Sequence, residues 1–464
     1  MREVETDYLV IGAGASGMAF ADTLVAHSEV EVVLVDRRHA PGGHWLDAYP
    51  FVRLHQPSAY YGVESLPLGR DRIDEHGANA GFYERASAAE ICDYYARALD
   101  ECLLPTGRVR FLGMSEHRRG DGNEHVVVSL LDGSQTAVRP RRAVVDASYV
   151  QSEIPSRHVP GFAVDDGVTL VPPNALVDLP APAERFTVIG AGKTAIDTCV
   201  WLLEQGVDPG RIRWIRGRDP WQFDRAFTQP LDLVGSYIRL QARWIEAAAA
   251  AEDGRDFARR LEDAGVLLRL DPAVEPEMFR GATVSRREID LLRAIEHVVR
   301  ARRVRRLGGR TVESDAGEIP GGGGGEIYVD CTAAGVPSSA PRPVFEPGRI
   351  TIQYVGVGFL PWCAATIGFV ESSGLGDDEK NRLCPPVVFT GDAADLTQLA
   401  YAALRGQVAR VRDETVAPWN AVSRLNPARA AFDHIDDEDV AGSLAFVIEH
   451  TRDALRNLER RAGS

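Results

Sequence analysis

The sequence predicts an α/β fold that contains two copies of one nucleotide-binding unit. The first copy reads as the buried strand "YLVIGAG", the helix "SGMAFADTLVAH" with apolar residues at helical spacing, and the strand "EVEVVLVDRR". The second copy repeats this order between Phe186 and Arg218. A strand, a glycine turn, a helix and a second strand in this order are typical of Rossmann-like dinucleotide-binding domains. We therefore expect two such domains in one chain.

The first glycine turn has the parts that hold a dinucleotide. Gly12, Gly14 and Gly17 form the spacing G-x-G-x-x-G, and Asp36 closes the second strand, with Arg37 directly after it. The glycines let the backbone approach a pyrophosphate, the helix start favours its negative charge, and the carboxylate binds a ribose 2′-hydroxyl. Because these parts are in register, we expect all five residues to belong to a cofactor site.

The second glycine turn allows two interpretations. A phosphate loop of the type G-x-x-x-x-G-K-[ST] is matched at its end, but Thr187 stands where its first glycine is required. As a dinucleotide turn, the segment fits G-x-G-x-x-A, the variant that allows tight helix packing. We interpret it as a second dinucleotide site formed by Gly190, Gly192, Lys193 and Thr194. Lys193 either reaches a phosphate or points into solvent from the first turn of the helix.

The two copies differ at the end of their second strands. Arg216 and Arg218 stand where the first copy has Asp36. A carboxylate repels a 2′-phosphate, whereas a guanidinium binds it through a forked, charge-assisted pair. The first site is therefore predicted to hold a bare ribose and the second to hold NADPH through these arginines. Two different dinucleotides in one chain imply electron transfer between them.

Composition and charge exclude several classes of function. The net charge of −15 argues against nucleic acid or an anionic membrane as the main partner. The basic stretch from Arg300 to Arg306 is interpreted as a solvated helix end or strand edge. No stretch of roughly 18 apolar residues occurs and the N-terminus is too charged for a signal peptide, so we expect a cytoplasmic protein. The six scattered cysteines exclude a disulfide reductase, and no His/Cys cluster has the spacing of a metal site.

The chain resembles the two-dinucleotide-binding-domain flavoproteins and, within them, the flavin-containing monooxygenase group. The matching features are "GAGASG" with Asp36, the turn "GGHW" at 42–45, "GAGKTA", the late "FTGDA", and "AVVDASY" and "YVDCTAAG" at the crossings between domains. The resemblance implies FAD at the first glycine turn and NADPH at the second. It implies two nested domains: 1–165 begins the FAD domain, 166–340 forms the NADPH domain with a helical insertion at about 228–300, and 341–464 completes the FAD domain.

The resemblance also assigns a site to the loop Pro41–Gly62 and to the late Gly-Asp pair. The loop should lie along the flavin with four candidate contacts, Gly43, His44, His55 and Gln56. His55 and Gln56 either hydrogen-bond the flavin or anchor the loop, and Trp45 is expected to pack more than to stack on the ring. Asp392 is expected to contact the ribityl chain of FAD, the alternative being a helix N-cap.

Two departures from that group bear on the reaction. The motif F-x-G-x-x-x-H is absent between the first crossing and the second glycine turn, and the first crossing reads Asp146-Ala147-Ser148 instead of Ala-Thr-Gly. The resemblance implies a monooxygenase that uses O2 and a flavin C4a-peroxide to oxygenate a small organic substrate. A flavoprotein dehydrogenase or reductase with another electron acceptor is the alternative, and a non-catalytic nucleotide-binding protein is the third. No catalytic side chain is identified beyond the candidates His55 and Gln56.

Overall fold

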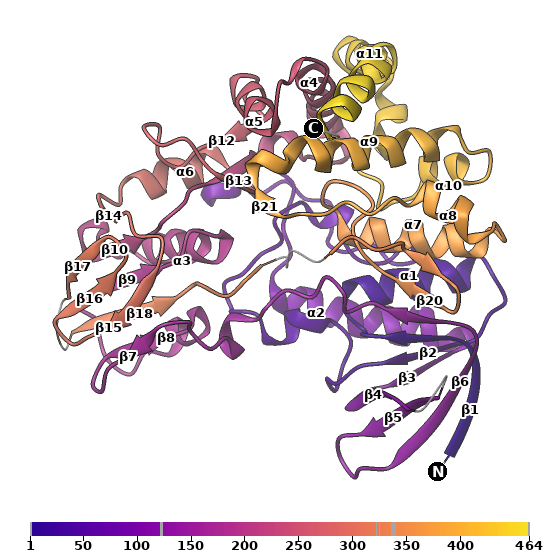
Figure 1. Cartoon of the computed structure of the whole chain (residues 1–464), viewed down its shortest axis with the longest axis horizontal. Coiled ribbons are helices and arrows are strands. Elements are labelled where there is room, and N and C mark those ends of the chain that lie inside the picture. The colour runs from indigo at the N-terminus through magenta and orange to yellow at the C-terminus, as the bar shows by residue number, and fades with distance from the viewer. Residues whose placement is uncertain (1, 121–123, 322, 324, 336–339, 463–464) are drawn as a thin grey trace.

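The structure is a computed structural model that describes residues 2–120, 124–321, 323, 325–335 and 340–462. It contains two mainly parallel sheets, the first at the lower right of Figure 1 and the second at its left. Helices from the middle and the end of the chain lie along the top of this view. The predicted α/β fold with two Rossmann-like units is confirmed.

The first sheet is built around β1 (Arg2–Ile11), with the strand order β19-β20-β6-β1-β2-β3 and the ribbon β4–β5 beside β6. Tyr8, Leu9 and Val10 are fully buried, as a continuous apolar run in the middle of a parallel sheet requires. The other strands of this sheet are β2 (Val32–Val35), β3 (Val109–Leu112), β4 (Ser115–Arg119), β5 (His125–Ser129), β6 (Gln135–Asp146), β19 (Phe345–Glu346) and β20 (Arg349–Thr351).

The C-terminal segment returns to the first unit and completes it, as predicted. β20 pairs with β6 in parallel, with Arg349 opposite Val144. Helix α7 (Leu360–Ser372) packs on α1 (Ala15–Ala26), and a Cβ on Gly368 would lie 2.8 Å from the Phe20 carbonyl oxygen. The two helices thus meet backbone to backbone. The neighbouring helices are α2 (Ala88–Arg97), α8 (Asp377–Leu383) and α10 (Val416–Val422).

The second unit is a fully parallel sheet with the strand order β14-β10-β9-β18-β8. Helix α3 (Lys193–Glu204) follows the second glycine turn and packs near α6 (Arg286–Arg293). The strands are β8 (Thr169–Val171), β9 (Arg185–Ile189), β10 (Ile212–Ile215), β14 (His297–Val299) and β18 (Glu326–Asp330). A small sheet beside it contains β7 (Ala163–Val164), β15 (Val304–Leu307), β16 (Thr311–Ser314) and β17 (Gly317–Pro320).

The segment expected to be helical at about 228–300 contains strands as well as helices. Helices α4 (Val234–Ala250), α5 (Gly254–Asp263) and α6 agree with the expectation, but β13 (Met278–Val284) is a strand. It pairs in parallel with β11 (Pro220–Asp224) and antiparallel with β21 (Gly391–Asp392). β12 (Leu267–Leu268) completes this sheet. β13 is a strand because its partners lie far away in the sequence, and a local helical pattern does not reveal them.

The end of the chain forms a helical layer over the insertion. Helix α11 (Glu438–Ala462) packs against α4 and against α9 (Leu396–Arg412), and the three lie together at the top of Figure 1. The chain leaves the first sheet after β6, enters the second at β8, and returns to the first sheet at β19. Residues 336–339, next to the expected boundary at 340, lie outside the described residues.

We expect Gly368→Ala to lower the free energy of unfolding by about 1–3 kcal/mol, because its methyl group would push α7 away from α1. The matched control is Gly442→Ala in α11, where the added Cβ would meet no atom within 4 Å apart from its own stretch of helix. Alanine favours helices, so this control should keep or gain stability. Denaturant unfolding measures both variants, and equal stabilities would contradict the close helix contact.

Candidate functional site

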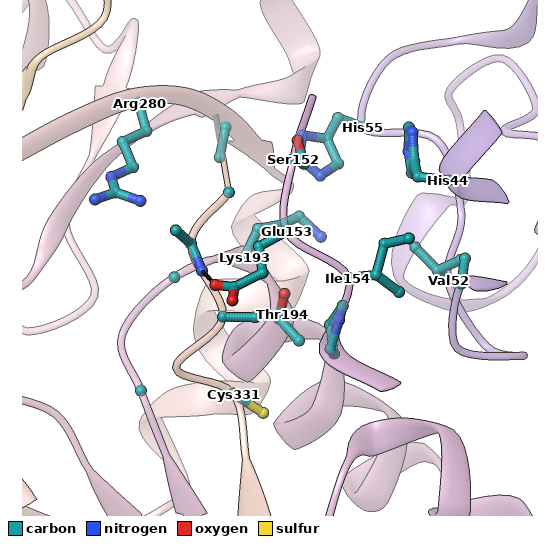
Figure 2. A pocket seen from close by; sticks show the side chains of 18 of the residues that line it. His44, Val52, His55, Ser152, Glu153, Ile154, Lys193, Thr194, Arg280 and Cys331 are labelled. Carbon is teal, nitrogen blue, oxygen red and sulfur yellow. Dashed lines mark hydrogen bonds between the residues drawn. The ribbon is translucent and has the colours of Figure 1, made fainter. Parts of the chain in front are cut away.

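One cavity of about 1080 Å³ lies between the two units, and both glycine turns line it. Figure 2 shows side chains from both units around this cavity, among them His44, His55, Lys193 and Thr194. Small-molecule sites usually measure roughly 300–1,000 Å³. The volume of this cavity is therefore at the upper end of the range for small-molecule sites.

The first glycine turn is held by contacts that require glycine. Gly12 has a left-handed φ of 104°, and a side chain on Gly17 would overlap the Gly12 carbonyl oxygen. Asp36 Oδ2 accepts a hydrogen bond of 2.7 Å from the Ala13 amide, so this carboxylate also fixes the turn. Gly12, Gly14 and Asp36 line the cavity, whereas Gly17 lies behind the turn and lets α1 approach β1.

Arg38, and not Arg37, lines the cavity beside Asp36. The Arg37 side chain is 72% exposed and lies 3.5 Å from Glu116. Arg38 Nε donates a hydrogen bond of 2.8 Å to Asp47. The structure corrects the expectation that Arg37 contacts a cofactor. Consecutive side chains of an extended segment point to opposite sides, and the motif alone does not decide which one faces the cavity.

The second glycine turn faces the cavity at the start of α3. Gly190 has a left-handed φ of 134°, and a Cβ there would overlap the Cys331 carbonyl at the second crossing. Gly192, Lys193 and Thr194 also line the cavity. The Lys193 ammonium donates to Asp197 one turn along α3, and its side chain is 8% exposed. This excludes the alternative in which Lys193 points into solvent.

Arg216 is buried inside the second unit and does not line the cavity. Its guanidinium lies 4.5 Å from the centroid of the Trp214 ring, and its Nε lies 3.6 Å from Asp219. The Arg216 amide still donates to Val299 of β14, so its backbone continues the sheet and its side chain packs on a face of it. The structure corrects the expectation that Arg216 contacts a phosphate. Arg218, two residues on, does line the cavity.

Three further arginines join Arg218 in the cavity lining, and the glycine motifs do not point to them. Arg280 comes from β13, and Arg302 and Arg303 come from the connection between β14 and β15. Arg302 donates to Glu277 at 2.8 and 2.9 Å. Among the described residues, no carboxylate lies within 4 Å of the guanidiniums of Arg218, Arg280 or Arg303. Burial, and then the charge of Arg218, lowers the pKa of Arg280. The basic stretch read as solvated thus contributes charge to the cavity.

His44, His55 and Gln56 face the cavity from the loop Pro41–Gly62. Burial, reinforced by the charge of Arg38, lowers the pKa of His44 to about 4. Burial, reinforced by Lys193, lowers the pKa of His55 to about 3. Both imidazoles are therefore neutral at pH 7, so each has one nitrogen that donates and one that accepts a hydrogen bond.

Gly43 and Trp45 hold the same loop in place. A Cβ on Gly43 would lie 2.8 Å from the Gly14 Cα, so the loop closes directly on the first glycine turn. Trp45 is buried, and its Nε1 donates a hydrogen bond of 2.6 Å to the Tyr61 hydroxyl. The two rings meet edge to face. Trp45 thus packs against Tyr61 at the edge of the cavity.

Asp392 does not line the cavity. It accepts a hydrogen bond of 2.9 Å from the Ala394 amide and caps a short helix turn. Asp392 is also opposite Met278 in the pairing of β21 with β13. The structure therefore shows the N-cap alternative, and the ribityl contact stays a prediction. A Gly-Asp pair before a helix fits both roles, so the sequence could not separate them.

The two crossings between the units form one wall of the cavity and share a cluster of polar side chains. His158 Nδ1 lies 2.8 Å from Glu153, and its Nε2 lies 3.0 Å from the Thr332 hydroxyl. Glu153 also accepts a hydrogen bond of 2.9 Å from the Ala334 amide. Sequence reasoning located the crossings but missed these residues, because the partners come from segments far apart in the chain.

Metal and thiol chemistry find no support in the described part of the chain. No group of three or more His, Cys, Asp or Glu residues there could hold a metal ion. All six cysteines are free thiols. Cys331 lines the cavity, but burial raises its pKa to about 12, so this thiol is protonated and unreactive at neutral pH. None of the described helices is both long and apolar enough to cross a membrane.

Comparison with known proteins agrees with this architecture. A family model described as "NAD(P)-binding Rossmann-like domain" matches residues 10–61, which contain the first glycine turn and Asp36. The solved structure of an oxidized steroid monooxygenase bound to NADP matches with a TM-score of 0.51 at 14% identity, over 80% of this chain and 85% of that chain. Fold and cavity thus define a two-domain, dinucleotide-binding α/β protein with the fold of that monooxygenase, as the resemblance predicted.

Two mycobacterial proteins are similar over nearly the whole chain. The uncharacterized proteins Rv2000 of Mycobacterium tuberculosis (strain H37Rv) and Mb2023 of Mycobacterium bovis are each 43% identical over 426 residues. These matches cover 92% of this chain and 78% of each relative. This chain belongs to the same family as these mycobacterial proteins.

We expect His55 to make folding sensitive to acid. The folded pKa is about 3 and an unfolded histidine titrates near 6.5, so only the unfolded chain gains this proton as the pH falls below about 6.5. Stability contributed by the neutral ring is therefore present above about pH 6.5 and is lost as the pH falls toward 3. At about pH 5, the free energy of unfolding should fall by roughly 2 kcal/mol less in His55→Gln than in the wild-type protein, relative to neutral pH.

Denaturant unfolding at about pH 7.5 and about pH 5 measures this difference. His76→Gln, at an exposed position, is the matched control and should keep the wild-type pH dependence. An unchanged pH dependence in His55→Gln would contradict the buried, neutral imidazole.

Proposed function

We propose that this protein is an FAD-dependent oxidoreductase reduced by NADPH, and that it is a monooxygenase acting on a small organic substrate with O2. The observation that carries the proposal is the single cavity onto which both glycine turns open. Electrons pass as hydride between two cofactor rings only when the rings touch. Two dinucleotides bound at the two turns would therefore extend their reactive ends into this shared space.

The residues at the first turn fit FAD. Gly12 and Gly14 present bare backbone to the cavity at the start of α1, where a pyrophosphate is favoured. Asp36 accepts from the Ala13 amide with one oxygen and from the Arg38 amide, at 2.8 Å, with the other. A carboxylate has about four acceptor positions, so it retains capacity for ribose hydroxyls. When bound, FAD would supply the redox chemistry, and the protein would bind, orient and shield it.

The residues at the second turn fit NADPH. Gly190, Gly192 and Thr194 lie at the start of α3, as a dinucleotide pyrophosphate requires. Arg218, Arg280 and Arg303 bring positive charge that no nearby carboxylate of the described residues neutralises. A 2′-phosphate would provide the missing negative charge. This unneutralised charge supports NADPH over NADH.

The cavity wall next to His55 suits oxygen chemistry because much of it is apolar. Val52 and Leu54 lie on the same loop, and the C-terminal segment adds the aromatic rings of Tyr354, Phe359 and Phe389. Such a wall excludes water and would protect a reactive intermediate from hydrolysis. His55 and Gln56 are the polar groups of the same loop that could orient a bound ring or substrate.

The second candidate is a flavoprotein dehydrogenase or reductase that passes electrons to another acceptor. It is favoured by one observation on the sequence: residues 159–176, where the related monooxygenases carry their motif histidine, contain no histidine. The same cofactors and the same cavity would serve this function. Only the reaction of the reduced protein with oxygen separates the two candidates.

We expect the protein to purify yellow, to be reduced by NADPH without air, and to consume O2 in step with NADPH when air is readmitted. The measurement is the flavin absorbance spectrum in a stopped-flow instrument, together with oxygen uptake. Gly14→Val should give colourless protein, because its side chain would occupy the space at the first turn and against Gly43. Slow reoxidation in air combined with fast reduction of a quinone would establish the dehydrogenase instead.

We expect Arg218→Ala to weaken NADPH binding by roughly ten- to a hundredfold while NADH binding changes little. A charge-assisted contact to phosphate contributes about 1.5–3 kcal/mol, and each 1.4 kcal/mol corresponds to about tenfold in affinity. Flavin reduction rates at increasing concentrations of each nucleotide provide the measurement. Arg216→Ala is the matched control, since this buried arginine should not affect the choice between the nucleotides. Equal losses for NADPH and NADH in Arg218→Ala would refute a phosphate contact.

A further inference from the structure

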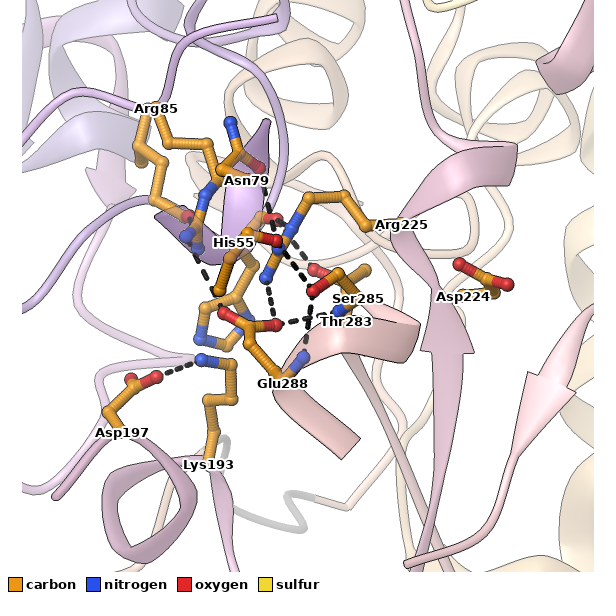
Figure 3. A network of polar contacts seen from close by, with 12 residues as sticks. His55, Asn79, Arg85, Lys193, Asp197, Asp224, Arg225, Thr283, Ser285 and Glu288 are labelled. Carbon is orange, nitrogen blue, oxygen red and sulfur yellow. Dashed lines mark hydrogen bonds and ion pairs between the residues drawn. The ribbon is translucent and has the colours of Figure 1, made fainter. Parts of the chain in front are cut away.

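A buried cluster of charged side chains lies directly behind His55 (Figure 3). Arg225 is fully buried and donates a hydrogen bond of 2.8 Å to Glu288 of α6. Arg85 lies on the other side of this carboxylate, with its Nη2 at 3.5 Å from Oε1. Glu288 is 3% exposed and Arg85 is 9% exposed. The three side chains come from both units and meet away from solvent.

The cluster holds the main chain of the loop that carries His55. The His55 carbonyl accepts hydrogen bonds from the Thr283 hydroxyl at 2.6 Å and from Arg225 Nε at 3.4 Å. The Leu54 carbonyl accepts one of 3.2 Å from Arg85 Nη1. Because the backbone on both sides of the imidazole is fixed, the ring has a defined place at the cavity wall.

The cluster carries one positive charge in excess. Arg85 and Arg225 are two cations against the single carboxylate of Glu288. Arg53 and Glu204 also act electrostatically on this cluster, and their opposite charges offset each other. The neighbouring pair of Lys193 and Asp197 on α3 is neutral overall. The charges of Lys193, Asp197, Arg225 and Arg85 all act on the His55 ring. The side chain of Arg85 also has no hydrogen-bond partner for its Nε in the described structure.

At neutral pH, the ionisation states of Glu288 and Arg85 agree with one excess positive charge in the cluster. Burial opposes ionisation of Glu288, but Arg225, Lys193 and Arg85 hold its pKa at about 2. Burial, and then Arg225, lowers the pKa of Arg85 to about 10, so its guanidinium stays charged. An uncompensated buried charge is costly, and groups perturbed by burial and by neighbouring charges cluster at functional sites. Such a charge favours any anion that forms on the cavity side of His55.

We propose that Arg85, held by Glu288, is a positioning residue that raises the reduction potential of a flavin bound beside His55. The inference rests on the proposed function. Hydride transfer from NADPH brings two electrons and one hydrogen to the ring and releases NADP⁺, so the ring gains one negative charge unless a proton follows. The excess charge behind His55 stabilises that negative charge, and the neutral imidazole between them does not cancel it.

The test compares the flavin midpoint potential, against a reference dye, in wild type, Arg85→Gln and Arg85→Lys. One unit charge at roughly 10 Å and an effective dielectric constant of about 20 changes an equilibrium by more than tenfold. Arg85→Gln should therefore disfavour reduction by about tenfold, which is a potential about 30 mV more negative. Arg85→Lys keeps the charge and should restore the wild-type value. Thr283→Val removes a hydrogen bond to His55 without changing charge and should leave the potential unchanged.

Glu288→Gln should shift the potential in the opposite direction, because it removes the only carboxylate of the cluster. A measurement on the wild-type protein needs no variant to fold. Below neutral pH, the midpoint potential should change by about 30 mV per pH unit. This slope is a tenfold change in the reduction equilibrium per pH unit and corresponds to one proton taken up with two electrons. If the reduced ring is neutral, two protons are taken up with the two electrons, and the reduction equilibrium changes a hundredfold per pH unit. That result would overturn the inference.

Flavin bound normally in Arg85→Gln with an unchanged potential would likewise overturn this inference and leave the proposed function standing. Absence of flavin from the wild-type protein would overturn the proposed function instead. The charge behind His55 can then still be measured in the apoprotein, by NMR titration of its imidazole. Arg85→Gln should raise the pKa of this ring and Arg85→Lys should not, because only the first removes the repelling charge. An equal pKa in all three proteins would show that Arg85 does not act on His55.

Discussion

The arrangement of this molecule depends on the hydrogen bonds that the second unit gives to main-chain carbonyls of the first. The segment from His55 to Ala80 contains only two short 3-10 turns and a few isolated bridges, so some of its carbonyls take side-chain donors. Side chains of the second unit supply donors: Thr283 to His55, Ser285 to Ala78 and Arg287 to Ala80. Each such hydrogen bond contributes about 0.5–1.5 kcal/mol net to stability. Separating the units would remove these donors together, and the cavity between the units is therefore part of the folded state.

The sequence was sufficient for those elements whose signals are local. Both strand–turn–helix units follow from apolar runs and glycine spacing, since the residues that fix each turn lie next to one another in the chain. The sheet formed by β11, β13 and β21 could not be predicted in this way. β21 has two residues, and β13 is a strand through its pairing with β11 and with Gly391 and Asp392, which lie about a hundred residues further along the chain. Short strands of this kind are determined by tertiary pairing more than by propensity.

In the cavity, too, the residues with local sequence signals could be predicted, and the residues placed by tertiary contacts could not. Gly12, Gly14, Gly190 and Gly192 could be found because backbone that must approach a ligand tolerates no other residue. The choice between Arg216 and Arg218 depends on the packing of Gly217, whose missing side chain leaves room for the backbone of Arg302. On either side of this close contact, Arg216 faces Trp214 and Arg218 faces the cavity. The sequence contains both arginines but not the contact that distinguishes them.

A cavity built from two units couples ligand binding to the way the units are held together. A ligand that contacts both units stabilises their docked arrangement by an amount that grows with its concentration over its dissociation constant. The loop Pro41–Gly62 is the physical link, because Gly43 closes on the first glycine turn while the His55 carbonyl is held by β13 and Arg225. Ordering of this loop at one end therefore favours its contacts at the other. By reciprocity, each dinucleotide should bind more tightly when the other is present. Under the proposed function the side chains need not attack the substrate, since their task would be to hold two cofactors in one charged and fixed space.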